Sequence, residues 1–360
     1  MSIKLTREQI QKLPKTDLHV HLDGSIDAKT IVELAKDQKI DLVEESRKLG
    51  IGNLKSSSVE EIDEKIFKIN YNSLKEYLIP FELVNCVLRT PESLQEVSYR
   101  IACDEFNEGV RYFELRFAPQ KHWTKDIGWE NIIRSVDSGL RRAMKEFNDT
   151  EAVKHNQELP YKCAIILCAM RMINKDMGNY YSTLNKLMAG ENLQSLAPMS
   201  SFEVAQLAVI SGKKGYLVTG FDLAGPEQGY PAGVHRDSFE YCYNNGILTT
   251  CHAGEAYGPE SISDAIKYCL VRRIGHGTNL FRWDMIQRKH PSGSAMTDEE
   301  KKEYMNNIAE RIARERTTME VCLKSNSQTS PELRDLSAHP VKEFLKYNLR
   351  VALSTDNRAI

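Results

Sequence analysis

Eight short runs of apolar and β-branched residues recur along the chain, and longer segments with helical spacing separate them. Each run is almost continuously apolar, which is the pattern of parallel strands that are covered on both faces. We therefore predict eight buried strands. They lie at approximately residues 16–20, 110–117, 161–169, 216–223, 247–252, 272–276, 318–323 and 350–355.

The segments between these runs have the spacing of amphipathic helices. In the clearest case Thr90 is placed to cap a helix, Pro91 occupies its first turn, and Leu94, Val97 and Ile101 share one face. The predicted helices cover residues 91–109, 129–147, 202–212, 262–270 and 341–345. Strand and helix alternate through eight strands, which predicts an α/β fold, a (β/α)₈ TIM barrel. A doubly wound open sheet is the alternative, but no Gly-x-Gly-x-x-Gly follows the first strand.

Two connections are longer than a minimal barrel needs. Residues 25–109 hold several helices after the first strand, and residues 281–316 form a polar, charged excursion after the sixth. Long insertions after strands lie at the face of a barrel that carries active sites. No helical pattern follows the eighth strand before Ile360, so we expect the eighth helix to be absent from the chain as given. Residues 1–360 then form a single barrel domain that is C-terminally truncated, or whose flank something else covers.

Composition excludes several classes of partner. The net charge of −2 gives no electrostatic reason to bind nucleic acid or an anionic membrane. No apolar run approaches the roughly 18 residues of a membrane span, and the polar N-terminus lacks the apolar core of a signal peptide. The eight cysteines are scattered without a Cys-x-x-Cys, which is typical of free thiols in a reducing compartment. We expect a cytoplasmic protein that is a monomer or a weak homo-oligomer.

Two histidines in the first strand are the first sign of chemistry. Side chains alternate between the faces of a strand, so His19 and His21 share one face while Leu18 and Val20 point to the other. Two imidazoles at this spacing supply half of a metal site.

Further polar residues collect where the other strands end. In a barrel these ends meet at one mouth, so His252 and Asp356 could join the first pair around one zinc ion that keeps a position for water. Zinc lowers the pKa of its water from 15.7 to about 7, and His276 with Asp356 would orient the resulting hydroxide and take its proton. Glu255, three residues beyond a ligand, is placed to act as a general acid toward a substrate nitrogen.

Singly, each of these residues also fits a structural role. His252 could be a core histidine, His276 a turn residue, and Asp356 with Asn357 a helix cap. Asp222, at the end of the fourth strand, could be an internal hydrogen-bonding residue. Because all of these residues lie at strand ends, one shared functional site is favoured over separate structural roles.

Several motifs occur in the order of one known family and together span nearly the whole chain. They are Asp-Leu-His-Val-His-Leu-Asp-Gly-Ser (17–25), Phe-Glu-Leu-Arg-Phe-Ala-Pro (113–119), Phe-Asp-Leu-Ala-Gly (221–225), His-Ala-Gly-Glu (252–255), Gly-His-Gly-Thr (275–278), Ser-Asn (325–326) and Ser-Thr-Asp-Asn (354–357). The chain thereby resembles the adenosine deaminase family of zinc hydrolases. The resemblance implies a barrel that converts adenosine or 2′-deoxyadenosine and water into inosine or 2′-deoxyinosine and ammonia.

The resemblance also implies a role for each site residue. The implied ligands of one zinc ion per chain are His19, His21, His252 and Asp356. Glu255 becomes the proton donor to purine N1, and His276 the residue that positions the zinc hydroxide. The implied substrate contacts are His21, Asp23 at the ribose hydroxyls, the Gly225 amide at purine N3, Asn357 at purine N7, and an apolar gate of Leu74, Tyr77, Leu78 and Phe81.

Two positions depart from the family pattern. Asn357 stands where many members have a second aspartate, and its amide can donate to N7 without being protonated. Lys324 stands near the barrel mouth where the family commonly has an uncharged residue, and a cation there could favour a nucleotide-like substrate.

Other functions stay open at this point. A related aminohydrolase could act on adenine, a modified adenosine or a nucleotide. A non-catalytic nucleoside- or metal-binding homologue is the third reading, but Glu255 and His276 are not needed merely to hold zinc. A binuclear amidohydrolase is disfavoured because residues 216–223 offer no lysine as a bridging ligand.

Overall fold

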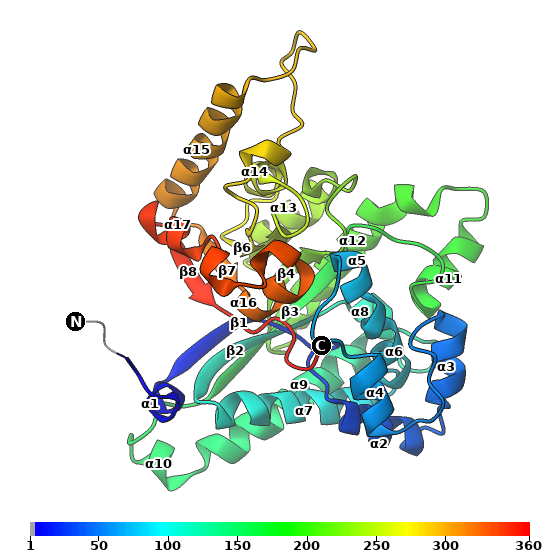
Figure 1. The fold of residues 1–360 in the computed structure, drawn as a ribbon. Coiled ribbons are helices and arrows are strands. Elements are labelled where there is room, and N and C mark those ends of the chain that lie inside the picture. Colours follow the sequence, from blue (N-terminus) through cyan, green and yellow to red (C-terminus); the bar gives the residue numbers. More distant parts are fainter. Residues whose placement is uncertain (1–3) are drawn as a thin grey trace.

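Eight parallel strands form one sheet in which the strands neighbour each other in sequence order, as the computed structural model in Figure 1 shows. The structure describes residues 4–360, apart from the side chains of Leu74 and Lys75. The strands are β1 (Lys15–His21), β2 (Val110–Phe117), β3 (Lys162–Met170), β4 (Val218–Ala224), β5 (Leu248–Ala253), β6 (Arg273–His276), β7 (Thr318–Val321) and β8 (Arg350–Leu353). All eight predicted strands are confirmed to within a few residues.

The sheet curls into a nearly closed barrel, and one bridge joins its first strand to the segment that follows its last. Val20 pairs with Asp356 in parallel register. The His21 amide donates to the Asp356 carbonyl at 2.8 Å, and the Asp356 amide donates to the His19 carbonyl at 2.7 Å. A doubly wound sheet would place β1 between other strands, so that alternative is wrong and the (β/α)₈ barrel is confirmed.

Helices surround the barrel where the apolar pattern predicts them. Thr90 caps α7 (Pro91–Asn107) by accepting a hydrogen bond from the Ser93 amide, and the predicted face of this helix is buried. The other predicted helices are α9 (Gly128–Asn148), α12 (Ala197–Lys213), α14 (Pro259–Tyr268) and α17 (Val341–Lys346). The helix α13 (Arg236–Asn244) was not predicted, because only Phe239 and Cys242 give it an apolar face.

The two predicted insertions are present, and a third was missed. The insertion after β1 holds α2 (Ala28–Asp37), α3 (Leu42–Leu49), α4 (Val59–Lys65), α5 (Leu74–Tyr77) and α6 (Ile79–Val87). After β6, a loop leads into α15 (Asp298–Glu315), which projects from the barrel in Figure 1. The missed insertion follows β3 and contains α11 (Asn179–Leu187), with its own apolar cluster around Ile173 and Tyr181.

The chain around β8 is less covered than the rest of the barrel. Leu353 is exposed, and residues 354–360 form no helix. Ile360 is nevertheless buried, because it packs with Tyr71, Tyr77 and Phe81 of the first insertion. None of the helices that the structure describes is both long and apolar enough to cross a membrane.

Candidate metal and catalytic site

Three imidazole nitrogens converge at the mouth of the barrel. The Nε2 atoms of His19 and His21 each lie 3.1 Å from Nε2 of His252, and 3.3 Å from each other. The carboxylate oxygen Oδ1 of Asp356 lies 3.5 Å from Nε2 of His19 and 3.4 Å from Nε2 of His21. Residues from β1, β5 and the segment after β8 are thus brought together, as the sequence predicts.

The three nitrogens have the spacing of ligands around one ion, and so does the Asp356 oxygen relative to His19 and His21. Ligands held ~2.1 Å from a tetrahedral metal lie roughly 3.4 Å from one another. Burial lowers the pKa of His19 and of His21 well below the ordinary value, which keeps both imidazoles in the neutral form that ligates metals. Burial raises the pKa of Asp356 to about 6, and a cation beside it would favour the ionised form. The donor set therefore fits a single divalent cation.

Two carboxylates fix the orientation of two of the imidazoles. Nδ1 of His19 lies 2.7 Å from Oε2 of Glu320, and Nδ1 of His252 lies 3.0 Å from Oδ2 of Asp222. A carboxylate acceptor at Nδ1 places the ring proton there and leaves the lone pair of Nε2 free for a metal. Asp222 is thus an internal hydrogen-bonding residue, but one that orients a candidate metal ligand.

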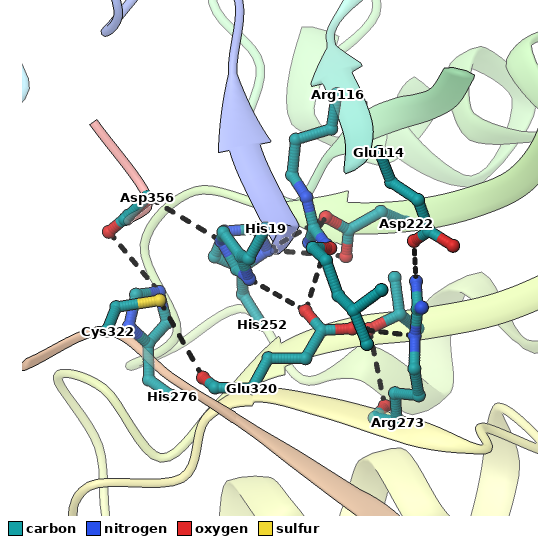
Figure 2. Close-up of polar contacts among 12 residues, drawn as sticks. His19, Glu114, Arg116, Asp222, His252, Arg273, His276, Glu320, Cys322 and Asp356 are labelled. Atoms are coloured by element: carbon teal, nitrogen blue, oxygen red, sulfur yellow. Dashed lines mark hydrogen bonds and ion pairs between the residues drawn. The ribbon is translucent and has the colours of Figure 1, made fainter. Parts of the chain in front are cut away.

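One buried arginine binds both of these carboxylates. Arg116, in β2, donates from Nη1 to Asp222 at 2.8 Å and from Nη2 to Glu320 at 2.9 Å (Figure 2). The same Nη2 donates to the Leu18 carbonyl at 2.6 Å. Burial alone would raise the pKa of Asp222, but His252 and the Arg116 guanidinium hold it well below its ordinary value. Arg116 therefore fixes the relative orientation of the His19 and His252 imidazoles through their carboxylate partners.

The polar network extends deeper into the barrel through Arg273. This residue donates to Oε1 of Glu320 at 2.7 Å and forms a second ion pair with Glu114, as Figure 2 shows. Counting Asp222 as well, three carboxylates face the two guanidinium groups of Arg116 and Arg273. The negative charge that is left over would be compensated by a cation at the histidine cluster.

His276, at the end of β6, faces the centre without joining the three imidazoles. Its Nδ1 lies 3.1 Å from Nδ2 of Asn326, so Nδ1 accepts and Nε2 carries the proton. Nε2 lies 3.7 Å from Oε2 of Glu255 and 4.0 Å from Oδ2 of Asp356. Burial lowers the pKa of His276 well below its ordinary value, so the ring is neutral. Oδ1 of Asn326 lies 3.2 Å from Nε2 of His339, which fixes this amide in turn.

The backbone is strained at the two ends of the site. His276 and Asp356 adopt φ angles of +65° and +68°, in the left-handed region that side chains other than glycine rarely occupy. Such strain persists only where the surrounding structure imposes it, and it concentrates at functional sites. Gly275 is required for a different reason, because a Cβ there would lie 3.0 Å from Cε1 of His19.

Glu255 lies in the loop after β5, with only 10 % of its side chain exposed. Burial raises the pKa of this carboxyl well above its ordinary value, and the charges of Asp356 and Glu227 act in the same direction. Both effects favour the protonated form of the carboxyl, which is the form that a general acid needs.

Asp23, the residue expected to bind the ribose hydroxyls, lies near the charges of Lys121 and Glu82. Burial raises the pKa of Asp23 to about 6, although the Lys121 ammonium opposes this shift. Lys121, in α8 (Pro119–His122), is buried and forms an ion pair with Glu82. Gly225 follows β4 with φ +98°. Lys324 is solvent-exposed at the start of α16 (Leu323–Thr329).

The expected gate is partly polar. Tyr77 and Phe81 are buried and Leu78 is half-buried, whereas the side chain of Leu74 lies outside the described part of the chain. Nδ2 of Asn357 donates to the Tyr77 hydroxyl at 2.8 Å, which links α5 to the segment after β8. A Cβ on Gly24 would lie 1.6 Å from Oδ1 of Asn357, so that glycine is needed for the amide to pack.

Sequence reasoning missed the residues that support the site. Arg116 and Glu320 were signalled only as ionisable residues inside otherwise apolar strands, a pattern that indicates a buried ion pair but not its partners. Asn326 belongs to a quoted motif, but its bond to His276 spans 50 positions and has no local signature.

Three comparisons with known proteins agree with this geometry. The sequence profile of the family described as "Adenosine deaminase" matches residues 14–360. An adenosine deaminase of Mycobacterium marinum is 31 % identical over 354 residues, which is 98 % of this chain and 82 % of that protein.

Two solved structures share the fold at low sequence identity. An adenine deaminase from Arthrobacter aurescens superposes with a TM-score of 0.67 at 19 % identity, covering 96 % of this chain and 82 % of that one. An amidohydrolase from Burkholderia ambifaria with bound zinc superposes with a TM-score of 0.69 at 15 % identity, covering 99 % and 80 %.

Replacing Arg116 with lysine tests the support of the imidazoles. Lysine keeps the charge but cannot bond both carboxylates in a fixed geometry, so we expect Arg116→Lys to weaken metal binding by roughly 10- to 100-fold. Competition with a chelator measures this affinity. Arg311→Lys, on the exposed face of α15 where Arg311 pairs with Glu315, is the control. Equal metal affinity in both variants would contradict the role of Arg116.

Proposed function

Because this chain belongs to the adenosine deaminase family, we propose that it is a zinc-dependent enzyme that hydrolyses adenosine and 2′-deoxyadenosine to inosine and 2′-deoxyinosine with release of ammonia. One observation carries this proposal. Three imidazole nitrogens lie 3.1–3.3 Å apart with a carboxylate oxygen 3.4–3.5 Å from two of them, and a carboxyl with a raised pKa and a neutral imidazole face the same centre. A site that only held a metal would need neither of these two groups.

The proposed ligands of one zinc ion per chain are His19, His21, His252 and Asp356. A zinc ion bound there would lower the pKa of a coordinated water to about 7, which supplies hydroxide near neutral pH.

The protein groups around the ligands direct the attack on the purine. His276 donates a hydrogen bond from Nε2 to the nucleophilic oxygen on one side of C6, and Asp356 takes the proton of this oxygen. Their side chains are fixed for this task, His276 by Asn326 and Asp356 by the backbone bridge to β1. Both groups are therefore oriented before substrate binds, which lowers the cost of reaching the transition state.

Glu255 supplies the proton that the ring needs. Donation from its carboxyl to N1 draws electrons from C6, so that oxygen can bond to this carbon. N6 then takes up the proton that Asp356 removed from the oxygen, the C6–N6 bond breaks, and N6 leaves as ammonia. The buried position of Glu255 raises the pKa of its carboxyl and so favours the form that carries this proton.

The residues around Asp23, where the ribose would bind, favour a neutral nucleoside over a nucleotide. Asp23 can accept hydrogen bonds from ribose hydroxyls. The nearby ammonium of Lys121 is already paired with Glu82, so it offers no free cation for a phosphate. Tyr77, Leu78 and Phe81 lie on the adjacent insertion, where they would cover the sugar and base and exclude bulk water. Lys324 is exposed and adds no buried charge.

Glu255→Gln tests the assigned general acid. The amide keeps the shape of the side chain but cannot donate the proton that N1 needs. We therefore expect kcat to fall by roughly 10²- to 10⁴-fold while zinc content and nucleoside affinity are retained. Glu303→Gln, at an exposed position of α15, is the control and should behave as wild type. Undiminished turnover by Glu255→Gln would rule out the proposed mechanism.

A side-by-side ultraviolet assay tests the substrate class. Zinc-loaded protein is offered adenosine, 2′-deoxyadenosine, adenine and AMP at equal concentrations. We expect the two nucleosides to be turned over with the highest kcat/KM, and a chelated sample to lose this activity until zinc is restored. A preference for adenine or AMP would replace the proposed substrate with one of these. Turnover of none of the four would indicate a non-catalytic homologue.

A further inference from the structure

A single buried carboxylate holds the loop that carries Glu255. Glu227, three residues after β4, is 4 % exposed. It accepts hydrogen bonds from three consecutive backbone amides, those of Gly254 at 2.7 Å, Glu255 at 2.8 Å and Ala256 at 2.9 Å. The Ser261 hydroxyl donates to the same carboxylate.

We propose that Glu227 is a positioning residue for the general acid, which sets the direction of the Glu255 side chain by fixing the peptide groups on both sides of its Cα. The proposal rests on the function assigned to Glu255 above. It adds a residue that acts through Glu255 and does not itself touch the substrate.

The bonding geometry carries this inference. Three successive amides that point at one anion form a tight concave turn, and each bond to the ionised carboxylate is of the strong, charge-assisted kind. Gly254 makes the turn possible, because its φ is +74° and a Cβ there would lie 2.5 Å from Cδ1 of Ile262. Since the amides of Glu255 and Ala256 flank the Glu255 Cα, the Glu255 side chain has little freedom to swing away from His276.

The opposite side of the loop is held by the segment that directly follows β6, the strand that ends at His276. Asn279, three residues beyond His276, donates from Nδ2 to the Glu255 carbonyl at 2.8 Å and from its amide to the Gly254 carbonyl at 2.7 Å. The loop is therefore clamped between Glu227 on one side and Asn279 on the other. The amides of residues 254–256 and the carbonyls of Gly254 and Glu255 are thus all hydrogen-bonded.

Glu227 is itself anchored to the metal site. Its carbonyl accepts from the Tyr230 amide at 3.0 Å, and the Tyr230 carbonyl accepts from Nη1 of Arg171 at 2.8 Å. Nη2 of this buried arginine donates to the His252 carbonyl at 2.7 Å. This chain of hydrogen bonds connects the loop that carries Glu255 to the backbone of His252. The negative charge of Glu227 also adds to the effects of burial and of Asp356 that raise the pKa of Glu255.

A buried carboxylate elsewhere provides a matched comparison. Asp137, in α9, accepts from the Leu217 amide at 2.7 Å and from Nε of Arg141 at 2.7 Å. Leu217 directly precedes β4, so this anchor lies at the end of the barrel opposite the catalytic residues. Asp137→Asn removes a buried carboxylate that holds backbone without touching the loop of Glu255.

The test is a double-mutant cycle on adenosine deamination by the zinc-loaded protein. We expect Glu227→Gln to lower kcat by roughly 10- to 100-fold, the effect of displacing a catalytic group by about 1 Å, with KM changed less than about threefold. In a Glu255→Gln background the same substitution should cost no further activity, since the group it positions is gone. Asp137→Asn should lower the melting temperature but not kcat.

Two results would overturn the proposal. One is an unchanged kcat in Glu227→Gln, and the other is an equal loss in both backgrounds, which is the behaviour of a purely structural anchor. If Glu227→Gln does not fold, the cycle is run with Glu227→Asp, which keeps the charge but withdraws the carboxylate by one methylene. A loss of kcat that vanishes in the Glu255→Gln background supports the proposal, and equal losses contradict it.

Amide hydrogen exchange gives a readout that does not need activity. Exchange at residues 254–256 should accelerate in Glu227→Gln at unchanged zinc content, and not in Asp137→Asn. Unaltered protection of these amides would contradict the clamp. If the wild type deaminates none of the four purines, the proposed function fails, and this exchange measurement still decides whether Glu227 holds the loop.

Discussion

One guanidinium group connects the two halves of the candidate metal site. Arg116 binds Asp222 and Glu320 together, and these carboxylates orient His252 and His19 (Figure 2). Three imidazole nitrogens that face one another without a proton between them repel, so their approach to 3.1–3.3 Å requires fixed tautomers. The Arg116 network fixes the tautomers of His19 and His252. Removal of one partner from such a buried network leaves an uncompensated charge, which makes the arrangement cooperative.

Some residues of the site also hold the barrel together. Asp356 contributes a carboxylate to the cluster, and its backbone forms the bridge that joins the segment after β8 to β1. That bridge runs through the peptide groups of His19 and His21, so closure of the barrel sets the register between the ligands. The left-handed backbone of Asp356 and of His276 is strain that the barrel accepts where it aims these two side chains. The hydrogen bonds from the amides of residues 254–256 to Glu227 fix the backbone that aims Glu255 in the same way.

Sequence reasoning succeeded where function follows strand geometry. Alternation along β1 was enough to place His19 and His21 on one face, and the common mouth of a barrel was enough to bring His252, His276 and Asp356 to them. It failed where a contact depends on a partner from a distant element. The bond between Tyr77 and Asn357 joins positions 280 residues apart, and the roles of Arg116, Glu227 and Asn326 depend on partners from other strands. The helix α13 and the insertion after β3 were missed because their apolar faces are short.

The account depends on one metal ion held by residues from three distant segments. Diffraction data collected above and below the zinc absorption edge, from crystals of zinc-loaded protein, locate such an ion without reference to activity. We predict a single anomalous peak per chain, within ~2.3 Å of Nε2 of His19, His21 and His252 and of a carboxylate oxygen of Asp356. A peak outside this cluster, two peaks within it, or none would contradict the account.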